Sequence, residues 1–184
     1  MEQTTSTAPN LYKHAAKSGA ILGGIGAAFT AILYVIDVTL LANWKIGIVL
    51  ILVFLGMVIY TGINYRKEAG GYLSYGKAFQ HGYITLMVAG LVSTIFQILL
   101  YHVIDPSIPQ TLTDASLEMA EEMMTSFGAS GDALDKAMEE QRIAIPARFT
   151  VGGLLKTYGW QFVSSAIISV ITSIFVKKNE PVTM

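Results

Sequence analysis

Five polar side chains near the ends of two long apolar segments are of types that could bind a ligand or pass protons. They are Asp37, Gln97, Tyr101, His102 and Asp105. Gln97, Tyr101 and Asp105 recur every four residues and would share one face of a helix, and Asp37 could approach them at the same membrane depth. Ionisable groups inside a membrane are costly and often functional. The group predicts a headgroup-binding or proton-relay site, although unrelated interface residues are the simpler interpretation.

A second set of side chains lies in a short polar stretch, residues 64–82, between two apolar segments. Tyrosines alternate there with glycines and cations, which suits the headgroup zone, where aromatic rings lie at the interface and cations bind lipid phosphates. This composition predicts a segment that binds lipid headgroups or a protein partner, and ordinary surface anchoring is the alternative. Its side chains are Arg66, Lys67, Tyr72, Tyr75 and Lys77.

Most catalytic and metal-binding chemistry finds no support in the sequence. The chain has no cysteine, and His14, His81 and His102 lack the spacing of a metal site. No G-x-S-x-G motif is present, and no paired carboxylates lie within an apolar segment. We therefore expect no catalytic residue, metal or cofactor, and no enzymatic activity. A net charge of −1 gives no basic surface for nucleic acid.

Four segments are long and apolar enough to cross a membrane. Of the 184 residues, 53% are hydrophobic and only 14% are charged, against about 25% charged in a soluble domain. About 20 apolar residues cross the hydrocarbon layer, and each crossing must be helical because lipid offers the backbone no hydrogen bonds. The sequence predicts an all-α polytopic membrane protein, with residues 1–184 as one membrane domain. The predicted spans are residues 18–42, 46–65, 82–104 and 154–176.

The placement of lysine and arginine sets the predicted orientation, because cytoplasmic loops carry an excess of these cations. Most acidic residues fall in the connection 106–150, on the opposite side from the densest cations. These patterns predict that both termini lie in the cytoplasm and that the connection 106–150 lies outside it. The cations on the predicted cytoplasmic side are Lys13, Lys17, Arg66, Lys67, Lys77, Lys177 and Lys178.

Residues 106–150 have the pattern of two amphipathic helices. After Asp114, which is suited to cap a helix, apolar residues recur at three- and four-residue spacing until Gly128, which is suited to end it. A second helix would begin at Ser130 or Asp132 and end at Pro146. We expect an extracytoplasmic helical hairpin. It is either a lid or docking surface with adaptable methionines or, more simply, two helices packed on each other and on the bilayer.

Rows of small residues predict where the helices approach one another closely. Lipid offers little hydrophobic drive for helix association, so close packing of small residues carries unusual weight. We expect these rows to pack within the bundle, and a contact between copies is the alternative. The rows are Gly19, Gly23, Ala27 and Ala31 in the first span and Ser165, Ser169 and Ser173 in the fourth.

Two stretches of the chain resemble the signature of a known family. Residues 65–79 contain Tyr-Arg-Lys-Glu and then Gly-Tyr-Leu-Ser-Tyr-Gly-Lys-Ala-Phe, and residues 101–106 read Tyr-His-Val-Ile-Asp-Pro. With the span count and the long third connection, they resemble domain-of-unknown-function family 4199, four-helix inner-membrane proteins found mainly in Bacteroidota. The resemblance covers about residues 11–178. It implies a multi-pass inner-membrane protein and no established activity.

Abundant packing features and scarce chemistry favour a non-enzymatic accessory or scaffold subunit. Besides membrane lipids, it would contact another membrane protein, or a second copy, through the small-residue rows or the 66–82 segment. The alternative is a small oligomeric transporter or lipid-handling protein that uses Asp37, Gln97, His102 and Asp105. Four spans are few for a transporter and no inverted repeat is evident, so this alternative would need a dimer.

Overall fold

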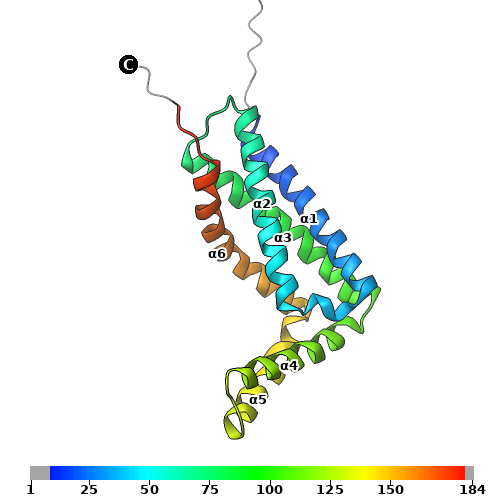
Figure 1. Ribbon diagram of the computed structural model, residues 1–184. Coiled ribbons are helices and arrows are strands. Elements are labelled where there is room, and N and C mark those ends of the chain that lie inside the picture. Colours follow the sequence, from blue (N-terminus) through cyan, green and yellow to red (C-terminus); the bar gives the residue numbers. More distant parts are fainter. Residues whose placement is uncertain (1–8, 181–184) are drawn as a thin grey trace, which may run out of the picture. The chain divides into compact units, whose positions relative to one another are not determined.

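The structure, a computed structural model, describes residues 9–180, and this part of the chain is almost entirely helical (Figure 1). A 3₁₀ turn, η1 (Val38–Leu41), follows the first helix, and a π turn, η2 (Leu100–Ile104), follows the third. The all-α prediction is confirmed. The α-helices are α1 (Leu11–Ile36), α2 (Trp44–Glu68), α3 (Tyr75–Leu99), α4 (Ile108–Ser126), α5 (Asp132–Arg148) and α6 (Val151–Val176).

Four of these helices are long and apolar enough to cross a membrane: α1, α2, α3 with its π turn, and α6. Many of their large apolar side chains point outward, among them Val35 on α1 and Leu52 on α2. In water such exposure would oppose folding, whereas lipid accepts it. The chain is therefore an integral, multi-pass membrane protein.

The first helix differs from the predicted span 18–42 at both ends. It begins at Leu11 and ends at Ile36 because Asp37 adopts an extended conformation, with φ −166° and ψ 114°. The Asp37 carboxylate accepts hydrogen bonds from the Thr39 backbone N–H at 2.9 Å and from its hydroxyl at 2.7 Å. These bonds start the 3₁₀ turn, so a capping aspartate ends the helix inside an unbroken apolar stretch.

Packing divides the chain into two compact units, which are described separately. Of the described residues, unit 1 contains 9–24, 52–91 and 161–180, and unit 2 contains 25–51 and 92–160. Unit 1 has two apolar clusters. One consists of Leu22, Val58 and Ala89, and the other of Tyr65, Leu73, Ala78 and Val176.

Small residues allow close helix contacts within unit 1. A Cβ atom on Gly19 of α1 would lie 2.5 Å from the Thr85 carbonyl oxygen and 2.7 Å from Val88 Cβ, both on α3. A Cβ atom on Gly82 of α3 would lie 3.4 Å from the Ser169 hydroxyl of α6. The α1–α3 approach therefore leaves no room for a side chain at Gly19.

The predicted small-residue rows are mostly turned into the protein. In the first row, the Gly19 and Gly23 positions are buried, whereas Ala27 and Ala31 are half-buried. The three serines of the second row, Ser165, Ser169 and Ser173, are all buried.

Unit 2 contains the connection between α3 and α6. Its buried cluster consists of Leu100 and Tyr101 from the π turn, Ile108 and Leu112 from α4, and Leu154 from α6. Helices α4 and α5 pack against each other as an antiparallel hairpin, so the predicted pair of helices is present.

The boundaries of the hairpin helices differ from those predicted. Helix α4 begins at Ile108 rather than Asp114, with Pro109 in its first turn, where a missing N–H does not interrupt the helical bonding. Helix α5 follows Gly131, which has a positive φ of 57°, and no side chain caps it. It continues two residues beyond Pro146 to Arg148, so the proline does not end the helix as predicted. Gly128, with φ 89°, does follow the end of α4 as predicted.

We expect Gly19→Val to lower the free energy of unfolding by about 1–3 kcal/mol, because the new side chain would overlap the backbone of α3. Thermal unfolding in mild detergent, followed by circular dichroism, measures the effect. Gly56→Val is the matched control, since it makes the same change within α2 at a position with nothing within 4 Å. Similar melting temperatures for the two variants would contradict the close α1–α3 contact.

Candidate functional site

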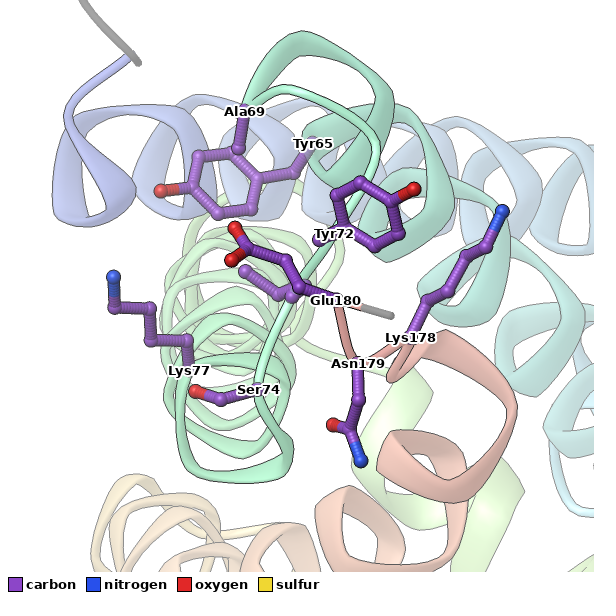
Figure 2. A pocket seen from close by; sticks show the side chains of 9 residues that line it. Tyr65, Ala69, Tyr72, Ser74, Lys77, Lys178, Asn179 and Glu180 are labelled. Carbon is purple, nitrogen blue, oxygen red and sulfur yellow. The ribbon is translucent and has the colours of Figure 1, made fainter. Parts of the chain in front are cut away.

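A polar pocket of about 360 Å³ lies where the loop between α2 and α3 meets the segment that follows α6, all within unit 1 (Figure 2). Its walls come from parts of the chain far apart in the sequence, so the fold rather than a local motif forms it. We call it the terminal pocket. Its lining residues are Tyr65, Ala69, Tyr72, Leu73, Ser74, Lys77, Lys178, Asn179 and Glu180.

Two glycines turn the chain at the entrance to the loop. Gly70 and Gly71 have φ values of 99° and 89°, a left-handed conformation that side-chain-bearing residues rarely adopt. The Gly71 N–H donates to the Arg66 carbonyl oxygen at 2.9 Å, which caps the end of α2. The loop therefore leaves α2 in a defined direction.

The loop is joined to the C-terminal segment by backbone hydrogen bonds. The Leu73 N–H donates to the Lys178 carbonyl at 2.8 Å, and the Lys178 N–H donates to the Leu73 carbonyl at 2.9 Å. The Arg66 guanidinium donates to the Val176 carbonyl at 2.8 Å, which satisfies an acceptor at the last turn of α6. These bonds fix the end of α6 to α2 and to the loop.

Two tyrosines, Tyr72 and Tyr75, contact the lysines that follow α6, and one of them also bonds to α6 itself. The Lys178 ammonium lies 5.5 Å from the centre of the Tyr72 ring, and the Lys177 ammonium lies 6.0 Å from that of Tyr75. Both distances are within the range of cation–π attraction. The Tyr75 hydroxyl also donates to the Val170 carbonyl of α6 at 3.1 Å.

The pocket carries two positive charges and one negative charge. Figure 2 shows the Lys77 and Lys178 side chains on opposite sides of the view, with the Glu180 carboxylate between them. Ser74 precedes the first turn of α3, whose free backbone N–H groups favour an anion. With this net positive charge, the pocket is suited to accept a carboxylate or a phosphate.

The five side chains predicted for this segment have different places in the structure. Tyr72 and Lys77 line the pocket, whereas Arg66 and Tyr75 bind the backbone of α6. Lys67 is exposed and is not among the lining residues. Sequence reasoning missed the contribution of residues 178–180. The signal for it was the lysine pair after the last span, predicted to lie on the same side of the membrane as the loop.

Three aromatic rings from three helices meet beside this pocket. His14 Nδ1 of α1 and His81 Nε2 of α3 lie 2.9 Å apart, and the Tyr65 ring of α2 stacks on His81 with centroids 5.0 Å apart. The Tyr65 hydroxyl donates to the Pro9 carbonyl at 3.2 Å. Because Tyr65 also lines the terminal pocket, this histidine pair supports one of its walls.

The histidine pair shares one hydrogen bond, so one of the two nitrogens must be unprotonated while the bond exists. His81 is 0% exposed, and its Nδ1 has no hydrogen-bond partner among the described residues. Across residues 9–180, no group of three acidic, histidine or cysteine side chains is placed to hold a metal. The pair was not anticipated, although His14 and His81 both precede predicted spans at the same membrane side.

Of the polar residues predicted to form a site in unit 2, Asp37 and Asp105 accept hydrogen bonds from different side chains. The Asp105 carboxylate accepts hydrogen bonds from the Ser107 hydroxyl at 2.6 Å and from the Tyr34 hydroxyl at 3.0 Å. The bonds from Ser107, and to a smaller extent the bond from Tyr34, lower the pKa of Asp105. The bonds from Thr39 lower the pKa of Asp37. Both carboxylates therefore favour the charged form that accepts these bonds.

The π turn changes which side chains share a face near Asp105. Tyr101 is buried and packs edge-on against Phe149, whereas His102 is exposed and its Nε2 donates to the Phe149 carbonyl at 3.1 Å. In the part of the chain that the structure describes, no hydrogen bond joins any two of the five predicted residues, Gln97 included. A shared headgroup or proton site at these residues stays a prediction.

Comparison with known proteins gives one match. The model of a family described as "Protein of unknown function (DUF4199)" matches residues 17–178, most of the chain, and this confirms the resemblance found in the sequence. No curated protein matches the chain, and no solved structure does.

We expect Arg66→Gln to lower the free energy of unfolding by about 1.5–3 kcal/mol, because it removes a charged donor from the end of α6. Lys67→Gln, one residue further along α2, removes the same charge from an exposed side chain and should change stability by less than about 0.5 kcal/mol. Thermal unfolding in detergent compares the two. Hydrogen exchange at the Leu73 amide should also accelerate in Arg66→Gln alone. Equal exchange in both variants would contradict the role of the Arg66–Val176 hydrogen bond in fixing the end of α6.

Proposed function

Because the chain belongs to the DUF4199 family of unknown function and is a multi-pass membrane protein, we propose that it is a non-enzymatic accessory or scaffold subunit of the bacterial inner membrane. In this proposal it holds another membrane protein at the terminal pocket. The partner contributes an acidic side chain from a segment beside its own membrane helix.

The observation that carries the proposal is the fixed geometry of the terminal pocket. The Leu73–Lys178 backbone bonds and the Arg66–Val176 bond hold its two walls together without a ligand. A pocket whose walls are already ordered loses little conformational entropy when it binds, which favours affinity from a small contact. A catalytic role has no comparable support among the described residues.

The charge of the pocket supports an acidic partner group. Lys77 and Lys178 offer two ammonium groups, and the tyrosines beside them offer flat apolar surface at the membrane interface. One partner carboxylate would balance the net positive charge of the pocket. A neutral or basic partner segment would leave that net charge unbalanced.

The distribution of cations supports an orientation in which the terminal pocket faces the cytoplasm. All seven cations assigned to the cytoplasmic side by sequence belong to unit 1, and the acidic hairpin belongs to unit 2. A positive loop stays in the cytoplasm during insertion. In the proposed topology both termini are cytoplasmic and α4–α5 lies outside.

This orientation predicts the pattern of thiol labelling. The chain has no cysteine, so single replacements Ser74→Cys, Ser116→Cys and Ser130→Cys each add one reactive group. In intact spheroplasts a membrane-impermeant maleimide should label the cysteines of Ser116→Cys and Ser130→Cys but not the cysteine of Ser74→Cys. Permeabilised membranes, in which all three should react, are the control. Labelling of position 74 in intact spheroplasts would reverse the proposed topology.

The role itself predicts a partner that depends on the pocket lysines. Purification of the full chain in mild detergent should recover a membrane protein in fixed stoichiometry, and Lys77→Gln with Lys178→Gln should reduce its recovery about tenfold or more, since two ion-paired groups are lost. Lys67→Gln with Lys177→Gln is the matched control, because it removes the same charge from lysines that do not line the pocket.

A crosslinker attached at Ser74→Cys, inside the pocket, should reach the same partner, whereas one attached at Ser116→Cys should not. The proposal fails if the chain is recovered alone. It also fails if the two double variants retain the partner equally.

A further inference from the structure

A second pocket lies at the elbow between α5 and α6, within unit 2, and its volume is about 860 Å³. Helix α5 lines it with Ala144, Ala147 and Arg148. Helix α6 lines it with residues from its first three turns, so that one side of each helix forms a wall. We call it the elbow pocket, and its α6 residues are Gly153, Lys156, Thr157, Gly159 and Trp160.

The elbow itself is held by backbone and side-chain contacts. The Thr150 hydroxyl donates to the Ala147 carbonyl at 2.8 Å and accepts from the Gly153 N–H at 3.0 Å, which links the end of α5 to the start of α6. A Cβ atom on Gly153 would overlap the Ala147 carbonyl oxygen, so the approach requires glycine there. The pocket is thus a built part of unit 2.

The charges in the elbow pocket are all positive. Arg148 and Lys156 both line it, and no acidic residue does. Among the described residues, neither cation forms an ion pair with an acidic side chain. The remaining lining is largely small or apolar, and Trp160, 71% exposed, extends it along α6. Two unpaired cations beside apolar surface are complementary to an anionic head with an apolar tail.

The position of the pocket on α6 suits a lipid. A helix of 26 residues is about 39 Å long, whereas the hydrocarbon layer measures ~30 Å, so a layer centred on α6 would leave about the first turn of the helix in the headgroup region. Arg148 precedes this helix and Lys156 is near its start, with a stem long enough to bring its ammonium to the interface. Trp160 is one turn deeper, beside the acyl chains.

We propose that the elbow pocket binds an acidic phospholipid, with the lipid phosphate between Arg148 and Lys156 and an acyl chain against Trp160. Arginine and lysine are the side chains that bind phosphate, and Gly159, where an added Cβ atom would have nothing within 4 Å, leaves room for the acyl chain. This site is separate from the terminal pocket and does not depend on the proposed partner.

The two tryptophans of the chain allow a direct test. In the full chain with Trp44→Phe, Trp160 is the only tryptophan, and brominated acyl chains quench its fluorescence on contact. In phosphatidylcholine nanodiscs, dibromo-phosphatidylglycerol should associate with Trp160 about 25-fold more strongly than dibromo-phosphatidylcholine. This ratio follows because each of the two cations contributes about 1 kcal/mol and every 1.4 kcal/mol is about tenfold in affinity. Arg148→Gln with Lys156→Gln should bring this ratio to about one.

Matched variants separate charge at the pocket from charge nearby. Lys136→Gln with Arg142→Gln removes the same two charges from exposed positions of α5 that do not line the pocket, and it should keep the preference of about 25-fold. Arg148→Lys with Lys156→Arg keeps both charges and should retain most of it. Circular dichroism of each variant checks that the helices remain.

Equal quenching by the two lipids, or a preference that survives Arg148→Gln with Lys156→Gln, would overturn the proposal. Displacement of the brominated lipid by inorganic phosphate, at an ionic strength where chloride has no effect, would overturn it as well. That result would assign the pocket to a soluble anion.

Discussion

Helix α3 contacts the other three long helices within unit 1, and the terminal pocket depends on these contacts. Glycine allows α1 to approach α3 at Gly19, and the Ser169 region of α6 approaches α3 at Gly82. The ring of His81 stacks on Tyr65 of α2. In lipid, close packing and hydrogen bonds rather than apolar burial fix how helices are rotated against each other. Because Tyr65 is also a wall of the pocket, the rotation of α2 against α3 sets the shape of the site.

Hydropathy and small-residue spacing predict the architecture well, because the bilayer leaves a long apolar segment few alternatives to a helix. The same reasoning places the ends of the helices poorly. Asp37 ends α1 inside an apolar stretch because its carboxylate accepts two local hydrogen bonds from Thr39. The π turn at Leu100–Ile104 likewise shifts the faces on which Tyr101 and His102 lie. Hydropathy averaged over a span does not register either effect.

The candidate site was harder to predict than the fold. The 64–82 segment was singled out from its composition, and Tyr72 and Lys77 do line the terminal pocket. The other wall of the terminal pocket includes Lys178, which follows α6. The adjoining His14–His81 contact joins residues on α1 and α3. Such pairs depend on how the helices are rotated and offset. A single sequence shows the membrane depth of a residue but not which neighbouring helix it faces.

The bridge between Leu73 and Lys178 has a consequence for the order of biogenesis. Residues 69–74 can reach their final side of the membrane before α6 has been synthesised. The second wall of the pocket appears only after α6 has been inserted and Lys178 has left the ribosome. A partner that recognises the terminal pocket therefore meets a chain in which α6 has already been inserted, and a chain that ends before α6 presents only half of the surface.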